Sequence, residues 1–463
     1  MLLFAGLVIC LSACSKKDSR NVEEASAEEP PPTSQRAQPV HDATFVGSKS
    51  CAECHADESK EWHGSDHHLA MQKADEESVL GNFDDVTFSH FGVESKFRKE
   101  DGKFFVKTPN SEGVPTDYPI EYTFGHYPLQ QYLIAFPGGR YQALSVCWDS
   151  RPKAEGGQRW FHLYPEEKVP HDDILHWTRQ HFNWNYMCAD CHSTDLKKNY
   201  YLASNSYNTT WAEINVSCEA CHGPGSEHLA WAKDPEAYKG SRPKSSGLTV
   251  VLKEPQDGGW TIDPITLKPS RTKPLESNVQ IETCARCHAR RRPLEDDFHH
   301  GQKFLDTHNL SVLEDMLYHP DGQINEEVYV HGSFVQSKMF HKGVRCTDCH
   351  NPHTLKLRAP GNALCAQCHV PAKYDSPTHH HHELGSTGAS CVDCHMPEKH
   401  YMVVDPRRDH SIRIPRPDLS VKLGTPNACN QCHQDQDPKW AAEALAKWLK
   451  EDGKPVLPEH YGE

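Results

Sequence analysis

The stretch CEACHGPGSEH, residues 218–228, places two cysteines three positions apart, a histidine directly after the second, and another histidine six residues further on. The same C-x-x-C-H unit occurs eight times and uses 16 of the 19 cysteines of the chain. In chain order, the eight motifs are Cys51/Cys54/His55, Cys188/Cys191/His192, Cys218/Cys221/His222, Cys284/Cys287/His288, Cys346/Cys349/His350, Cys365/Cys368/His369, Cys391/Cys394/His395 and Cys429/Cys432/His433.

This motif is typical of covalent haem c attachment, in which both thiols bond to the porphyrin and the following histidine binds the iron as an axial ligand. Pairs of C-x-x-C units also form zinc sites, and cysteines can pair as disulfides, but neither requires a histidine after every second cysteine. With 33 histidines in 463 residues, eight such coincidences have a probability on the order of 10⁻⁹. We therefore expect eight covalently bound haem c groups.

The composition supports this interpretation. Hydrophobic residues make up 37% of the chain, and the 28 glycines still leave the apolar share below the roughly 45–50% of ordinary globular domains. Eight porphyrins would supply the missing apolar material of the core. The net charge of −15 argues against a nucleic-acid partner, which would require clustered lysine and arginine.

The N-terminal residues indicate export. Residues 1–14 combine an apolar run that is too short to cross a bilayer with LSAC, which resembles a bacterial lipoprotein signal with lipidation at Cys14. A plain secretory signal is the alternative. Residues 15–43 are charged and proline-rich, which predicts a disordered linker. We expect a protein on the periplasmic side or at the cell surface, anchored to the outer membrane by its lipid.

The long interval between the first two motifs predicts a different kind of structure. Asp101-Gly102 separates two runs of strand-forming residues, as in a hairpin, and further aromatic runs follow up to residue 165. We predict a first haem segment at 44–83 and a small β-rich insertion at 84–165, in which Cys147 is a buried small side chain. A seven-haem domain at 166–433 and a C-terminal helix and tail at 434–463 would complete a mainly α multihaem cytochrome c with extensive haem-wrapping loops.

The spacing of the motifs predicts close contact between haems. The first cysteines of the last four motifs are only 19, 26 and 38 residues apart, so little polypeptide can separate their porphyrins. Outside the motifs 25 histidines remain, enough to supply every iron with a second axial ligand. His228 and His353 follow their own motifs too closely to reach the opposite porphyrin face, so we expect each to bind a neighbouring iron.

Several stretches resemble known multihaem cytochromes. CAECHADESKEWHGSDHHLAM resembles the first haem segment of bacterial cytochromes related to the tetrahaem acceptor of hydroxylamine oxidoreductase. The stretches VSCEACHGPGSEH, GSFVQSKMFHKGVRCTDCHNPH and DPRRDHSIRIPRPDLS resemble an octahaem branch whose members often continue into tetratricopeptide repeats. The resemblance implies the following sixth ligands: His67, His176, His228, His300, His341, His353, one of His379, His380 and His382, and His410.

Three functions fit this sequence. The first is an electron relay between redox partner proteins of the cell envelope. The resemblance implies a second, an oxidoreductase that acts on nitrite, hydroxylamine or tetrathionate at one haem with an open sixth position. None of the eight motifs has the lysine that some such reductases carry in place of the motif histidine. The third is a subunit of a haem filament.

Overall fold

The computed structural model describes residues 43–236, 245–252, 259–295, 298–451, 453 and 457. The predicted signal, Cys14 and nearly all of the predicted linker lie outside these residues. The structure contains 28% helix and 22% strand, so the expectation of a mainly α chain is not confirmed. The sequence prediction underestimated the strand content because the haem-motif part also contains four two-stranded ribbons.

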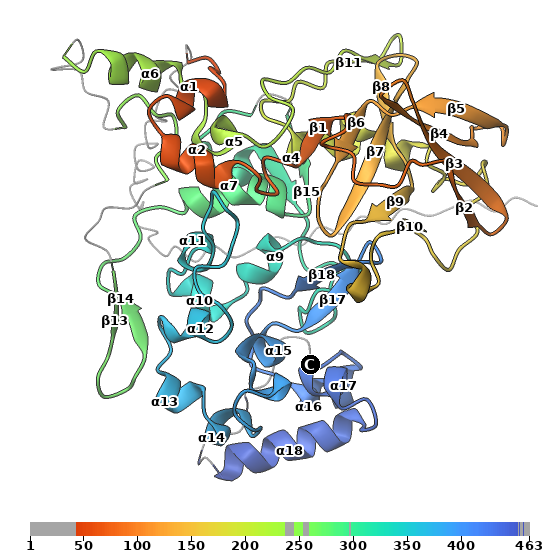
Figure 1. The fold of residues 1–463 in the computed structure, drawn as a ribbon. Coiled ribbons are helices and arrows are strands. Elements are labelled where there is room, and N and C mark those ends of the chain that lie inside the picture. Colours follow the sequence, from red (N-terminus) through yellow and green to blue (C-terminus); the bar gives the residue numbers. More distant parts are fainter. Residues whose placement is uncertain are drawn as a thin grey trace, which may run out of the picture. The chain divides into compact units, whose positions relative to one another are not determined.

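A β-rich module of two antiparallel sheets lies between the first two motifs (Figure 1). The first sheet has the order β1-β6-β7-β9-β10, with β8 paired to β7, and the second has the order β2-β3-β4-β5. Their strands are β1 (Met71–Lys73), β2 (Val86–His90), β3 (Val93–Glu100), β4 (Lys103–Pro109), β5 (Pro115–Pro119), β6 (Tyr122–Phe124), β7 (Leu129–Phe136), β8 (Arg140–Ala143), β9 (Val146–Asp149) and β10 (Arg159–His162).

The predicted hairpin is present, and its turn explains the pairing of β3 with β4. Asp101 and Gly102 have φ angles of 49° and 73°, the left-handed conformation that a tight hairpin turn requires and that Asp-Gly tolerates. Side chains then alternate along both strands, so that Phe97 and Val106 are fully buried. Phe97 stacks on Trp160 of the other sheet, with ring centres 3.6 Å apart. The two sheets therefore share one aromatic core.

The rest of the chain consists mostly of short helices and loops. The helices are α1 (Ser48–Ala52), α2 (Ala56–Trp62), α3 (Trp184–Met187), α4 (Ala189–His192), α5 (Cys218–His222), α6 (Ser226–Lys233), α7 (Val279–His288), α8 (Phe304–Thr307), α9 (His331–Phe334), α10 (Lys338–His341), α11 (Cys346–Cys349), α12 (Ala363–Ala366), α13 (Pro371–Tyr374), α14 (Pro377–His380), α15 (Cys391–His395), α16 (Pro417–Leu423), α17 (Ala428–Cys432) and α18 (Pro438–Glu451). The ribbons pair β11 (Tyr200–Tyr201) with β12 (Ser206–Tyr207), β13 (Trp260–Ile262) with β14 (Pro269–Arg271), β15 (Arg291–Pro293) with β16 (His308–Leu310), and β17 (Glu398–Tyr401) with β18 (Asp405–Arg408).

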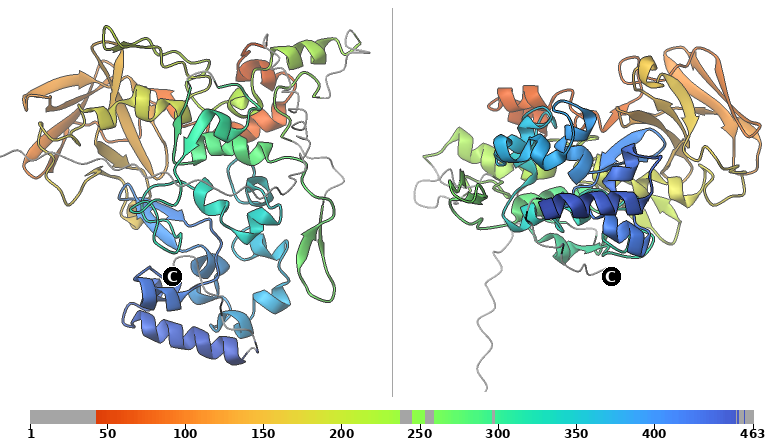
Figure 2. Two further views of the ribbon diagram at one scale, coloured as in Figure 1. Left: turned by 180° about the vertical axis from the view of Figure 1, so that it is seen from behind. Right: turned by 90° about the horizontal axis from the view of Figure 1, so that it is seen from below.

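The motif helices follow one another through the molecule. From α5 and α7 the chain runs through α11 and α12 to α15 and α17, with α18 at the far end (Figure 1; Figure 2 shows the same succession from behind). The helix α4 lies beside the β-rich module instead. Among the described residues, no helix combines the length and the apolar character needed to span a membrane.

An apolar contact joins the β-rich module to the C-terminal motifs. Cys147 on β9 and Phe161 on β10 are buried against Val404, which lies between β17 and β18. Cys147 is fully buried, in agreement with its predicted role as a small core side chain. The predicted C-terminal helix is α18, whose Trp448 stacks on His381 with ring centres 4.1 Å apart.

The buried His162 of the β-rich module predicts a loss of stability in mild acid. Burial, and next the charge of His90, lower the pKa of His162 from 6.5 to about 4. Below pH 6.5 the unfolded chain takes up a proton that the folded chain refuses, so the free energy of unfolding falls by about 1.4 kcal/mol per pH unit down to pH 4. Urea unfolding at pH 6.5 and pH 5 should show about 2 kcal/mol less pH dependence in His162→Asn than in the wild type. Equal pH dependence in both proteins would contradict this prediction.

Candidate haem centres

Most motifs form about one helical turn, and this local structure orients their three functional side chains. In α5, for example, Cys218, Cys221 and His222 are at positions i, i+3 and i+4. Residues three and four apart lie on the same face of a helix. Both thiols and the imidazole therefore face one side, as attachment to a single flat group requires.

The predicted attachment residue Cys54 differs from this pattern. Helix α1 ends at Ala52, so Cys54 lies in the turn before α2 and is exposed. Cys432, in the last motif, is exposed as well. Cys54 belongs to the first motif of the chain and Cys432 to the last. The backbone N–H groups of Cys54 and His55 still donate to the carbonyl oxygen of Cys51, at 3.2 and 2.9 Å, so motif 1 keeps the turn that attachment requires, and haem attachment at Cys54 stays a prediction.

Five motif histidines lie opposite a histidine from outside the motifs. The ring centres of each pair are 6.1–6.4 Å apart. The pairs are His55 with His228, His288 with His67, His350 with His410, His395 with His379, and His433 with His382. A metal bound by two opposing imidazoles lies about 2 Å from each nitrogen, which puts the ring centres roughly 6 Å apart. These spacings therefore fit an iron between the two rings.

A sixth motif histidine also has a histidine near it. Burial, and next the charge of His353, lower the pKa of His222. His353 follows the motif histidine His350 by only three residues, but it lies near the histidine of another motif, His222. His228, six residues after His222, likewise lies opposite His55. The short spacing predicted that each of these histidines binds a neighbouring iron, and this binding stays a prediction.

In the described part of the chain, three motif histidines have no imidazole opposite them at such a distance: His192, His222 and His369. His192 is in edge contact with Phe124, with ring centres 4.7 Å apart. His369 is in edge contact with Tyr374, at 5.4 Å.

Three histidines implied as sixth ligands do not lie opposite a motif imidazole. His176 is buried beside Thr178, 2.8 Å from its hydroxyl oxygen. His300 lies 3.2 Å from a guanidinium nitrogen of Arg286 and 3.3 Å from the carbonyl oxygen of Ala220, and burial and then Arg286 lower its pKa to about 3. His341 is exposed and contacts the ring of Phe340.

The cluster at 379–382 differs from its expectation in another way. The resemblance implied one ligand among the three histidines, but two of them, His379 and His382, lie opposite motif rings. The third, His380, accepts a hydrogen bond from the backbone N–H of His382 through Nδ1.

Thiols of different motifs also meet, and these contacts set the order of the motifs in space. Hydrogen-bonding contacts join four pairs of thiols: Cys51 with Cys218, Cys191 with Cys287, Cys284 with Cys346, and Cys365 with Cys391. In three more pairs one thiol lies near enough to raise the pKa of the other: Cys221 with Cys287, Cys349 with Cys368, and Cys394 with Cys429. Numbered along the chain, the motifs therefore form the path 1-3-4-5-6-7-8, with motif 2 as a side branch on motif 4.

This order explains why the two exposed thiols differ from the others. Motifs 1 and 8 are the ends of the path, so each has a neighbouring motif on one side only, whereas motif 2, which also has one neighbouring motif, lies beside the β-rich module. In motif 1 it is Cys51 that meets the neighbour, through Cys218, and Cys54 is left at the surface.

Neither a three-ligand metal cluster nor a disulfide is found among the described residues. No three His, Cys, Asp or Glu side chains among them converge as a metal cluster would require. No two cysteines in the described part of the chain are paired as a disulfide.

Comparisons with known proteins agree with this geometry. A family model described as cytochrome c554 and c-prime matches residues 50–87 and 152–223, and a doubled CXXCH motif model matches residues 338–374. No curated protein matches the chain significantly. The crystal structure of the outer cell wall cytochrome OcwA is similar over 88% of this chain and 87% of that chain, with 17% sequence identity and a TM-score of 0.55.

The chain has the fold of a multihaem c-type cytochrome. It binds haem c through its C-x-x-C-H motifs. Two further structures are similar at lower TM-scores. An undecahaem cytochrome from the S-layer of Carboxydothermus ferrireducens has 18% identity over 88% of this chain and 60% of its own, with a TM-score of 0.40. The octahaem sulfite reductase MccA of Wolinella succinogenes has 15% identity over 81% of this chain and 59% of its own, with a TM-score of 0.32.

A partly buried charge cluster joins motifs 2 and 4. Asp190, inside motif 2, lies 2.6 Å from Arg291 and 3.8 Å from Arg286 of motif 4. The two guanidinium groups keep the pKa of Asp190 below its usual value although burial alone would raise it. An acidic residue between the two cysteines of a motif is a signal that could have suggested such a partner, but the sequence does not indicate which arginine provides it.

A buried carboxylate connects motif 1 with motif 3. Like Asp190, it lies between the two cysteines of its motif. Glu219 lies between the cysteines of motif 3 and is 2% exposed. Its oxygens accept hydrogen bonds from the backbone N–H groups of Val46, Gly47 and Gly225 at 2.8–2.9 Å. The chain before motif 1 is thereby tied to motif 3, next to the contact between Cys51 and Cys218.

Replacing this carboxylate should destabilise the protein. Glu219→Ala leaves three backbone N–H groups without their acceptor, at a cost of about 1–3 kcal/mol each where they stay buried, so the free energy of unfolding should fall by at least about 3 kcal/mol. Urea unfolding would measure the change. Glu53→Ala, at the exposed acidic position of motif 1, is the control and should change stability by less than about 0.5 kcal/mol. If Glu219→Ala and Glu53→Ala were equally stable, this stabilising role of Glu219 would be contradicted.

Proposed function

We propose that this cytochrome relays electrons through eight covalently bound haem c groups in the bacterial cell envelope. The observation that carries the proposal is the series of neighbouring thiols, four pairs in hydrogen-bonding contact and three pairs near each other, that runs through all eight motifs. A protein that used its haems separately would not need to place the attachment thiols of neighbouring motifs close together.

Haem c supplies reversible one-electron chemistry at its iron. The chain's own residues provide the remaining requirements of a relay. Paired thiols would fix the position of each group, and opposing imidazoles such as His55 and His228 would bind its iron from both sides. Two axial imidazoles leave no position for a substrate, which favours transfer over catalysis.

The proposed location is outside the cytoplasm. The lipoprotein-type signal at 1–14, with lipidation at Cys14, would export and anchor the chain, and OcwA is an outer cell wall cytochrome. The partners would be redox proteins of the envelope that give and accept electrons at the ends of the path.

The haem count tests this proposal. Intact mass of the exported protein, together with a pyridine haemochrome assay, should give eight haems for one chain and a lipid on Cys14. Five or fewer haems, or zinc in a metal analysis, would refute the relay as proposed. A mature chain without lipid would refute only the anchor.

A second candidate function is an octahaem oxidoreductase that acts on nitrite, hydroxylamine or tetrathionate. It is favoured by His192, which has no opposing imidazole among the described residues, and by the position of motif 2 at the end of a branch. His369 of motif 6 has the same feature, but motif 6 lies within the path.

Electron paramagnetic resonance distinguishes the two functions. A pure relay should show low-spin signals that do not respond to nitrite or hydroxylamine. A stoichiometric high-spin signal that shifts when either compound is added would favour the oxidoreductase. Removing motif 2 with Cys188→Ala and Cys191→Ala should then abolish the response.

A further inference from the structure

One short segment lies at two histidines that would serve the haems of different motifs. His410 lies opposite His350 of motif 5, with ring centres 6.4 Å apart, and its Nδ1 is 2.9 Å from the carbonyl oxygen of Arg408. Three residues after His410, the carbonyl oxygen of Arg413 lies 2.7 Å from Nδ1 of His395, the motif 7 histidine. The segment 408–413 therefore carries the imidazole that faces motif 5 and contacts the imidazole of motif 7.

The contact between Arg413 and His395 is reciprocal. The backbone N–H of Arg413 donates to the carbonyl oxygen of His395 at 3.1 Å, while its own carbonyl oxygen accepts from the imidazole. The orientation of the His395 ring thus depends on where the Arg413 backbone is held.

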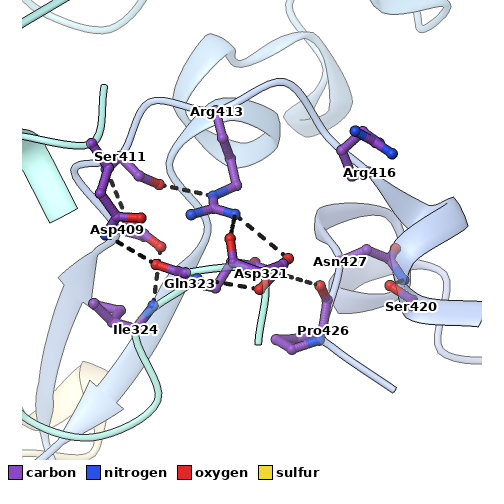
Figure 3. Close-up of polar contacts among 12 residues, drawn as sticks. Asp321, Gln323, Ile324, Asp409, Ser411, Arg413, Arg416, Ser420, Pro426 and Asn427 are labelled. Carbon is purple, nitrogen blue, oxygen red and sulfur yellow. Dashed lines mark hydrogen bonds and ion pairs between the residues drawn. The ribbon is translucent and has the colours of Figure 1, made fainter. Parts of the chain in front are cut away.

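Buried polar contacts hold this backbone in place (Figure 3). The Arg413 guanidinium donates to the carbonyl oxygen of Asp321 at 3.1 Å and lies 3.5 Å from its carboxylate. Its Nε donates to the hydroxyl of Ser411 at 2.8 Å. Asp409 accepts from the backbone N–H groups of Ser411 at 2.8 Å and of Ile324 at 3.3 Å. These contacts connect the segment 408–413 with residues 321–324.

The burial of these charges makes the arrangement specific. Asp321 is 1% exposed and Asp409 is 2% exposed, and a buried charge is tolerated only where partners satisfy it. Asp321 has a second partner in Gln323, whose amide donates to it at 2.7 Å and also donates to the carbonyl oxygen of Pro426 at 2.7 Å, just before motif 8. A shift of Arg413 would leave the Asp321 carboxylate without its cation.

From this geometry we infer that Asp321 and Arg413 are positioning residues that set the redox potential at motif 7 and, through the shared segment, at motif 5. The inference rests on the proposed haem attachment. A carbonyl oxygen that accepts the Nδ1–H of an axial histidine fixes the ring and increases its basicity. A more basic ligand stabilises the more positive iron state, so this contact lowers the potential.

The experiment compares Asp321→Asn with the wild type as complete exported holoproteins. An equilibrium redox titration followed by electron paramagnetic resonance should show one or two of the haem potentials shifted upward and the others unchanged, with altered low-spin g-values for the shifted species and full haem content. Ser411→Ala, which removes one contact of Arg413 and no charge, should shift the same species in the same direction by less.

Asp149→Asn is the matched control, because Asp149 is also fully buried and pairs with Arg151 at 2.7 Å, but within the β-rich module. It should leave every potential unchanged. Unchanged potentials in both Asp321→Asn and Ser411→Ala, or equal shifts in Asp149→Asn, would refute the positioning role. A wild-type protein with too few haems would instead refute the proposed function, so the two failures can be told apart.

Discussion

Replacing Cys346 and Cys349 by alanine is expected to divide the relay into two parts that no longer exchange electrons. Motif 5 is the one link between motif 4 and motif 6 among the thiol contacts of the described residues: Cys284 meets Cys346 on one side, and Cys349 interacts with Cys368 on the other. Without the two thiols the haem of motif 5 is not attached, so motifs 1 to 4 should be isolated from motifs 6 to 8.

A photosensitiser attached near motif 1 provides the measurement. Glu58 lies in α2, next to motif 1, and is exposed, so Glu58→Cys labelled with a ruthenium complex would inject one electron at that end after a flash. Freeze-quenched electron paramagnetic resonance should show the electron shared among all motifs in the otherwise unchanged protein. In the variant that lacks motif 5, it should stay within motifs 1 to 4.

Removal of motif 2 is the matched control for this experiment. Cys188→Ala with Cys191→Ala deletes the same number of thiols and one haem, but motif 2 is a branch on motif 4 through Cys191 and Cys287. The injected electron should therefore still reach motif 8. An electron that still reaches motif 8 without motif 5, or one that fails to do so without motif 2, would refute the order of motifs.

The sequence allowed the local features to be predicted. The C-x-x-C-H spacing alone indicates which residues attach haem, because both thiols and the imidazole come from one turn of the chain. The hairpin at Asp101-Gly102 was predictable for the same reason, since its conformation depends on two adjacent residues.

Features that depend on long-range packing could not be predicted as well from the sequence. His300 and His228 both follow a motif within about a dozen residues, yet His228 lies opposite His55 while His300 lies against Arg286. The distinction depends on where segments far apart in the sequence meet. The exposure of Cys54 has the same origin, because it follows from the place of motif 1 at an end of the path. The contact between the backbone carbonyl of Arg413 and His395 could not be predicted from the sequence, because a backbone contact does not depend on which residue makes it.

Replacing His228 by alanine is expected to convert one low-spin haem to high spin and leave every haem attached. His228 lies opposite His55 at 6.2 Å, so its removal opens one axial position, whereas the thioether bonds of motif 1 do not depend on it. Low-temperature electron paramagnetic resonance should gain one high-spin signal per chain, and the haemochrome assay should not change.

His300→Ala decides between the ligand set implied by the resemblance and the one indicated by the geometry. The resemblance implies that both histidines bind iron, so each variant should gain a high-spin signal. In the structure, His300 contacts Arg286 and Ala220 and faces no motif imidazole, so its removal should leave the spin states unchanged. A high-spin signal in His300→Ala would show that this imidazole binds iron in the holoprotein, and unchanged spectra in His228→Ala would show that the ring facing His55 does not.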